Sequence, residues 1–277
     1  MWKKDQPARN LCFVCLIMFS FLLAGCATTP REIAKEDSLF QISLLNALLL
    51  GEYDGFVSVE TLKSYGDTGI GTLDTLDGEM IFLDGEVYKA KADGSVEVVD
   101  DAVLVPFAVA TPFIPDVIVL PIENLSGIEP LKSMLDAYIA ETTNDFNRFY
   151  VAKIQGTFAQ ILIRSVPAQQ KPYLPLSTIA ETQKEYAYEL LKGTIVAFRC
   201  PDYVEGINLP GWHLHFLSSD ASEGGHLLGV TVTQAELQMG DMKHFQVLLP
   251  SSSSFATMDI ASDRRKETLA IEGSTHP

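Results

Sequence analysis

Three histidines of this chain are placed where one metal ion could bind them together. His213 and His215 are separated by a single leucine, and His226 follows behind two glycines. Side chains two positions apart on a strand point to the same face, so His213 and His215 share a face. Residues 217–225 are polar and end in glycine, which predicts a hairpin loop whose returning strand brings His226 beside the pair. Three neutral imidazoles with an open fourth position are typical of a catalytic zinc site.

The same residues allow other readings. A single strand histidine is commonly a core or surface residue with one satisfied hydrogen bond, and two at this spacing can occur by chance. Cupins also use a His-x-His pair, but they place a glutamate four or five residues after the second histidine, and residues 216–220 contain none. No glycine elbow marks a Ser or Cys nucleophile. Residues 66–71 contain three glycines, but not at the spacing of a dinucleotide-binding glycine loop, so a phosphate site is not expected there.

Several further segments, from Leu39 to Pro250, occur together in a consistent order. They are Leu39-Phe-Gln-Ile-Ser43, Ala47-Leu-Leu-Leu-Gly-Glu-Tyr-Asp-Gly55, Gly66-Asp-Thr-Gly-Ile-Gly-Thr72, Leu76-Asp-Gly-Glu-Met80, Arg164-Ser-Val-Pro-Ala-Gln-Gln-Lys-Pro-Tyr173, Pro210-Gly-Trp-His-Leu-His-Phe216 and Gly224-Gly-His226. With these motifs the chain resembles the α-acetolactate decarboxylase family. The resemblance implies zinc-dependent decarboxylation of 2-acetolactate to acetoin.

The resemblance also implies roles for particular residues. It makes His213, His215 and His226 the zinc ligands. It makes Glu79, Arg164 and Thr72 active-site residues, and a glutamate near the C-terminus, Glu272 in the short match Ala270-Ile-Glu-Gly273, reaches back to the metal. Without the family, Arg164 fits a structural salt bridge at the end of an apolar strand, and Glu79 fits a solvated turn after Asp77-Gly78.

The chemistry of the reaction calls for these residue types. Loss of CO₂ from a 2-hydroxy-3-oxo acid pushes an electron pair into the adjacent ketone, and zinc is a Lewis acid and template for those oxygens. Arg164 is a fixed, planar donor for the carboxylate and the developing anion. Glu79 is the candidate for the proton that the carbon must receive. The alternatives are a cupin-like or hydrolytic metalloenzyme acting on another small acid, and a non-catalytic surface lipoprotein that retained the fold.

The N-terminus predicts export. Basic residues precede an apolar run over 11–23, which is short for a spanning helix, and small residues follow it, so residues 1–25 are expected to be a signal peptide. Leu23-Ala-Gly-Cys26 is typical of a bacterial lipobox, with Cys26 acylated and residues 26–36 as the lipidated cysteine and tether. We expect an exported, membrane-anchored lipoprotein on the periplasmic face or cell surface. An ordinary secreted protein with Cys26 at the boundary by chance is the alternative.

Charge and cysteine content restrict the partners. The formal net charge is −16, which is the wrong sign for nucleic acid or anionic lipid headgroups. We therefore expect a small-molecule substrate and no nucleic acid, and we leave a homodimer open. Cys12 and Cys15 leave with the signal peptide and Cys26 carries lipid, so only Cys200 is left as a thiol, and the core and the metal, not a disulfide, must stabilise the fold.

The pattern of elements favours an α+β fold with two domains: residues 37–145 as an N-terminal α+β domain, and residues 146–277 as a metal-binding domain with a C-terminal tail. Mixed or antiparallel sheets would pack against each other, with the metal site on a C-terminal hairpin facing Glu79. We expect helices over 36–50, 128–141 and 178–192, strands over 79–83, 86–91 and 95–99, a hairpin of 149–155 with 157–164, and a tail that is helix-capable only near 263–271.

Overall fold

The computed structural model describes residues 1–2 and 37–272, apart from the side chains of residues 117–119 and 272. Nearly all of the expected signal peptide, Cys26 with its acylation, and the tether therefore lie outside the described residues. The described residues 37–272 belong to one compact unit. No helix that the structure describes combines the length and the apolarity needed to span a bilayer.

A seven-stranded mixed sheet forms the first layer of this unit, in the order β14-β1-β8-β3-β4-β5-β6. Its strands are β1 Ser38–Ile42, β3 Thr68–Thr72, β4 Glu79–Leu83, β5 Glu86–Ala90, β6 Val96–Val98, β8 Phe107–Thr111 and β14 His244–Leu248. β14 runs parallel to β1, and the other pairs are antiparallel. β4 turns directly into β5 because Asp84 and Gly85 both adopt positive φ, as a two-residue hairpin turn of this kind requires.

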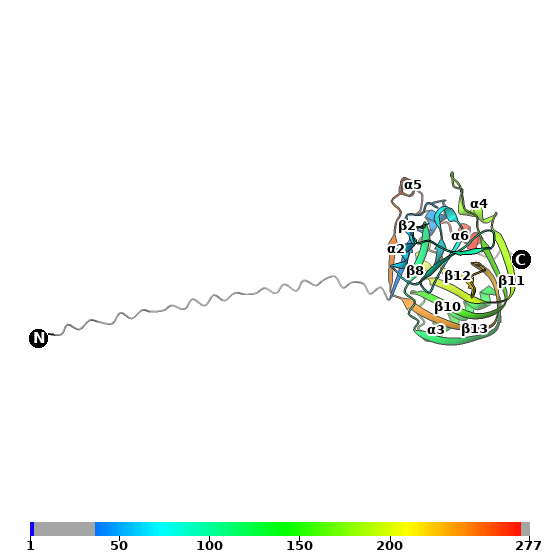
Figure 1. Ribbon diagram of the computed structural model, residues 1–277, viewed down its shortest axis with the longest axis horizontal. Coiled ribbons are helices and arrows are strands. Elements are labelled where there is room, and N and C mark those ends of the chain that lie inside the picture. The colour runs from blue at the N-terminus through cyan, green and yellow to red at the C-terminus, as the bar shows by residue number, and fades with distance from the viewer. Residues whose placement is uncertain (3–36, 273–277) are drawn as a thin grey trace. The chain divides into compact units, whose positions relative to one another are not determined.

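A five-stranded antiparallel sheet forms the second layer, in the order β10-β11-β12-β13-β9. Its strands are β9 Val117–Ser126, β10 Phe149–Ser165, β11 Lys184–Cys200, β12 Gly211–Ser218 and β13 Gly224–Met242. β13 also pairs with β10, so four of the strands close into a ring. Helix α3, Ile128–Thr142, lies beside β9 and β13 and packs Leu131, Leu135 and Ile139, spaced four residues apart, against the core of this ring (Figure 1).

Side chains on the two faces of β12 pack against different parts of the protein, and this difference positions the site. Leu214 and Phe216 belong to the core of the ring. Leu217 instead belongs to a cluster that also contains Ile70 and Ile81 of the seven-stranded sheet. Because side chains alternate along a strand, His213 and His215 share the Leu217 face and point toward that sheet.

The sheets also exchange strands. β9 precedes residue 145 in the chain but belongs to the five-stranded sheet, and β14 follows it but belongs to the seven-stranded sheet. Each layer is thus completed by a strand from the other part of the chain, while the division into two domains stays a prediction.

Short helices and one small strand pair complete the unit. They are α1 Leu45–Leu49, α2 Val59–Lys63, α4 Leu176–Ala180, α5 Ser253–Thr257 and α6 Arg265–Glu272, the 3₁₀ helices Asp74–Leu76 and Asp202–Val204, and the pair of β2 Val57–Ser58 with β7 Leu104–Val105. The Ser58 side chain accepts a hydrogen bond from the backbone N–H of Thr61 and so caps α2. Helix α6 ends the described chain, where the sequence predicted a tail helix.

Two of the expected elements are wrong. Residues 178–192 are not a helix: α4 ends at Ala180, and β11 begins at Lys184. Tyr186 and Tyr188 lie opposite Ile163 and Ile161 on β10, so a two-residue alternation governs this segment instead of a helical period.

Residues 149–165 are not a hairpin but the single strand β10. Gly156 lies in its middle, where a Cβ would collide with the carbonyl oxygen of Gln234 on β13. This glycine allows close approach of two strands and does not mark a turn. The helix expected over 36–50 is also only partly correct, because Ser38–Ile42 form β1 before α1 begins.

Candidate active site

The site begins as a row of side chains across three neighbouring strands. His215 on β12 lies opposite His226 on β13, and His226 lies opposite Arg164 on β10. Directly paired residues of antiparallel strands present their side chains on the same face of the sheet. Gly225 makes the row possible, since a Cβ at that position would lie 2.6 Å from the Arg164 carbonyl oxygen.

The three histidines converge through their ring nitrogens. The distance from His213 Nε2 to His226 Nδ1 is 3.0 Å, and that from His213 Nε2 to His215 Nε2 is 3.2 Å. One potential ligand atom of each histidine lies within 4.8 Å of the other two. Ligand atoms that bind one tetrahedral ion at about 2.0–2.1 Å are about 3.3 Å apart, so the cluster fits a single metal ion.

A backbone contact orients one of these rings. His215 Nδ1 lies 2.9 Å from the carbonyl oxygen of Met80 on β4. A carbonyl only accepts hydrogen bonds, so Nδ1 carries the proton, and the lone pair of Nε2 faces the other two histidines. A metal-binding histidine is commonly oriented by such a bond from its other ring nitrogen.

Burial keeps His213 and His226 neutral. Burial lowers the pKa of His213 to about 3, and the positive charges of Arg164 and Lys132 act in the same direction. The pKa of His226 is lowered well below its usual value, first by burial and then by Arg164. At neutral pH both imidazoles are therefore uncharged, which is the form that binds a metal.

The seven-stranded sheet brings a carboxylate to the histidines. Glu79 opens β4, and its Oε2 lies 3.6 Å from His215 Nε2. Thr72 lies opposite Glu79 on β3 and donates a hydrogen bond of 2.8 Å to the carbonyl oxygen of Gly78. The structure thus brings both residues from the seven-stranded sheet to the histidine cluster on the other sheet.

The side-chain amide of Gln183 orients Arg164, and nothing in the sequence indicated this contact. The arginine side chain is buried, and Nη1 donates to Gln183 Oε1 at 2.9 Å. Gln183 Nε2 in turn donates to Glu185 Oε1 at 2.8 Å. Because a carboxylate only accepts and a guanidinium only donates, the orientation of the Gln183 amide is settled. Gln183 lies in the segment expected to be helical, so no spacing signal pointed to it.

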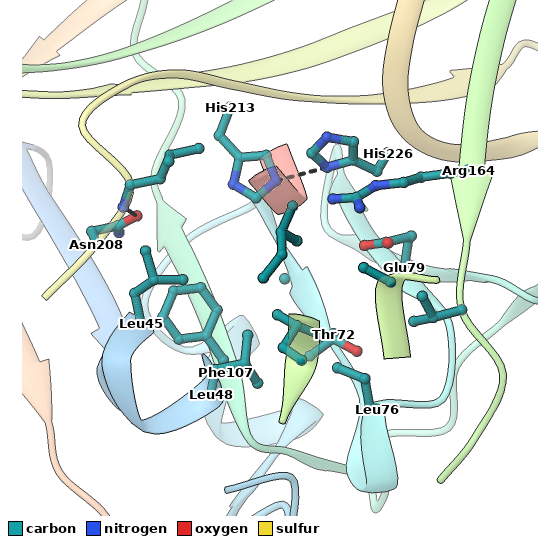
Figure 2. A pocket seen from close by; sticks show the side chains of 16 residues that line it. Leu45, Leu48, Thr72, Leu76, Glu79, Phe107, Arg164, Asn208, His213 and His226 are labelled. Atoms are coloured by element: carbon teal, nitrogen blue, oxygen red, sulfur yellow. Dashed lines mark hydrogen bonds between the residues drawn. The ribbon is translucent and has the colours of Figure 1, made fainter. Parts of the chain in front are cut away.

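These groups meet at one end of a small cavity. Figure 2 shows the side chains of His213, His226, Arg164 and Glu79 together at that end, with apolar walls beyond them. The cavity volume is about 50 Å³, several times the space that one water molecule needs. Helices α1, α4 and α6 supply apolar wall residues, and Asn208, which sequence reasoning missed, adds an amide.

Glu272 has a less direct relation to the site. It is the last residue of α6, and its side chain lies outside the described residues. Its neighbour Ile271 is buried and lines the cavity. The helix therefore ends beside the cavity at Ile271, and contact of Glu272 with the metal stays a prediction.

Comparisons with known proteins identify the family of this chain. The family model for alpha-acetolactate decarboxylase matches residues 39–262, a range that ends before Glu272. A relative described as alpha-acetolactate decarboxylase from Methanosarcina mazei is 38% identical over 236 residues, which cover 85% of this chain and 80% of the relative. A second, from Brevibacillus brevis, is 34% identical over 264 residues, covering 91% of each chain.

Solved structures show the same fold. The crystal structure of alpha-acetolactate decarboxylase from Bacillus subtilis strain 168 superposes with a TM-score of 0.81 at 31% identity, and the match covers 86% of this chain and 100% of that one. A Staphylococcus aureus protein described as similar to alpha-acetolactate decarboxylase gives a TM-score of 0.77 at 30% identity, covering 84% of this chain and 98% of that one. Sequence and fold agree over most of the chain, which therefore belongs to the α-acetolactate decarboxylase family.

Proposed function

We propose that this protein decarboxylates 2-acetolactate to acetoin, using a zinc ion bound by His213, His215 and His226. The observation that carries the proposal is that three imidazoles converge beside Arg164 and Glu79 at one end of a small cavity. The choice of reaction rests on the relatives, which are described as alpha-acetolactate decarboxylases. The side chains at the site are of the types that this reaction requires.

The donor set supports zinc in particular. Three imidazole nitrogens favour a borderline metal ion over magnesium or calcium, which prefer oxygen ligands. When bound, zinc would act as a Lewis acid toward the ketone and hydroxyl oxygens of the substrate.

Arg164 would bind the substrate carboxylate. The guanidinium already uses Nη1 on Gln183, which aims the remaining N–H groups and leaves their planar arrangement intact. Burial strengthens its attraction for an anion, because little water competes for the charge. The apolar walls beyond it exclude water from the carbon that loses CO₂.

Glu79 would manage the proton. When the bond between the substrate's C2 and its carboxylate carbon breaks, CO₂ leaves as a neutral molecule. The two electrons of the broken bond stay on the remaining fragment. That fragment must then gain one proton at carbon. Glu79 Oε2 lies at the histidine end of the cavity and is the carboxylate positioned to hold and deliver this proton. As the family resemblance implies, we also propose Thr72, which lies opposite Glu79 on β3, and Glu272 as active-site residues, with Glu272 reaching back to the metal.

The location proposed from the N-terminal sequence is membrane attachment through acylated Cys26, with the enzyme on the periplasmic face or at the cell surface. The lipobox Leu23-Ala-Gly-Cys26 and the preceding apolar run support it. A homodimer stays a prediction.

One experiment tests the function and the metal together. Protein produced from Cys26 onward is assayed for acetoin formation, and its metal content is measured on the same sample. We expect His213→Ala, His215→Ala and His226→Ala each to lose metal and activity together, because two remaining ligands cannot hold the ion. His244→Ala, which changes an exposed histidine on β14, is the matched control. Full activity in metal-free protein would refute the proposal.

A further inference from the structure

Helix α1 has a second task besides lining the cavity. Leu45 and Leu48 form part of the cavity wall. Asn46, between them, is buried, and its Nδ2 donates to the carbonyl oxygens of Ile260 and Ser262 at 2.9 and 3.3 Å. Both acceptors belong to the C-terminal segment, so a buried amide on the helix that lines the cavity holds the backbone of that segment.

The turn after α1 provides a second attachment. Glu52 is buried, and both of its carboxylate oxygens accept hydrogen bonds, one from the Ser252 hydroxyl and one from the Ser254 hydroxyl at 2.7 Å. A carboxylate is seldom buried without partners, since loss of its hydration must be offset. Here the two serines lie at the start of the same C-terminal segment.

The far end of this segment meets the cavity itself. Ile271 is buried in an apolar cluster with Leu45 and Leu48 and lines the cavity. Arg265 pairs with Glu205 through Nε and Oε1 at 2.7 Å. The two residues after Glu205 accept hydrogen bonds from the backbone N–H groups at the start of α1. Both ends of the segment are thus attached to α1, to the turn after it, or to the loop that hydrogen-bonds its first residues.

We propose that Asn46 and Glu52 are positioning residues that seat the C-terminal segment, residues 252–272, against the cavity, and that this seating determines how closed the cavity is. The segment does not order itself: α6 is eight residues long, and an isolated helix of that length is unstable in water. Buried side chains in the body of the protein must therefore supply the order. The functional half of the inference rests on the proposed function, since it treats the cavity as the substrate site.

Limited proteolysis gives a readout that is independent of catalysis. Arg264-Arg265-Lys266 offer trypsin three adjacent sites within the segment. In Asn46→Ala and Glu52→Gln we expect cleavage at these sites to be at least about 10-fold faster than in the parent protein, because the hydrogen bonds that hold the segment are removed or weakened. Asn147→Ala and Glu60→Gln replace exposed residues of the same types and should leave the rate unchanged.

The same variants are then compared in turnover. With the segment unseated, we expect KM to rise or kcat to fall by at least about 5-fold, while the metal content and the midpoint of global thermal unfolding stay near the parent values. Ser254→Ala removes one attachment from the side of the segment and leaves α1 unchanged. It should shift proteolysis in the same direction even if Asn46→Ala does not fold.

An unchanged rate of tryptic cleavage in the folded variants would refute the proposal that Asn46 and Glu52 hold the C-terminal segment. Faster cleavage with unchanged kcat and KM would overturn the link between the segment and the cavity. If the parent protein makes no acetoin, the proposed function fails, whereas the tryptic comparison still decides whether Asn46 and Glu52 hold the segment.

Discussion

Replacement of Arg164 by lysine separates charge from geometry at the substrate carboxylate. The arginine is 5% exposed, and its Nη1 is already committed to Gln183 at 2.9 Å. The guanidinium can keep that bond and still present parallel N–H groups to a carboxylate. A lysine ammonium keeps the charge but is a single point, so it must share one nitrogen between the amide and the substrate.

The size of the effect follows from the bonds that are lost. A hydrogen bond to a charged group contributes about 1.5–3 kcal/mol. Loss of one such bond to the reacting substrate lowers kcat/KM by about 10- to 100-fold, since about 1.4 kcal/mol corresponds to a factor of ten in rate. A loss of this size with the charge retained would assign the effect to the planar fork.

The assay is the rate of acetoin formation over a range of substrate concentrations, with metal content and thermal unfolding measured on the same sample. Gln183→Leu is the companion variant. It keeps Arg164 but removes the amide that orients it, so it should also lower kcat/KM, and its effect should be smaller in the Arg164→Lys background than in the parent. Turnover of Arg164→Lys within about 2-fold of the parent would show that charge alone matters.

Three further predictions test other parts of the structure. Gly225→Ala should lower the unfolding temperature and the metal content together, because its Cβ would lie 2.6 Å from the Arg164 carbonyl oxygen. Gly229→Ala on the same strand should be much milder, because the nearest neighbour of its Cβ is a side-chain carbon at 3.3 Å. Burial raises the pKa of the Cys200 thiol to about 12, so at pH 8 it stays protonated, and mass spectrometry should find it unmodified by a thiol reagent until the protein unfolds. Cys26→Ser should move the protein from the membrane fraction to soluble material or unprocessed precursor, and unchanged membrane association would point to the apolar run as an uncleaved anchor.

Local sequence patterns determined the parts of the site that depend on neighbours in the chain. The spacing of His213, His215 and His226 predicted a hairpin with three imidazoles on one face, and the structure brings their nitrogens within ligand distance. Helix 128–141 and strand 79–83 were likewise predicted correctly, because each is long or regular enough for its own pattern to show. The family motifs added Arg164 and Glu79, which periodicity alone would have left as a salt bridge and a turn residue.

Only the tertiary structure decided how these parts meet. Glu79 faces His215 because two sheets pack face to face, and Gln183 reaches Arg164 because β11 pairs with β10. The same pairing turned residues 184–192 from an expected helix into a strand. The contacts of Asn46 and Glu52 with the C-terminal segment join residues about 200 apart in sequence. Such contacts depend on strand register and on sheet packing, which arise from the sum of many distant interactions and leave no periodic signal in either segment.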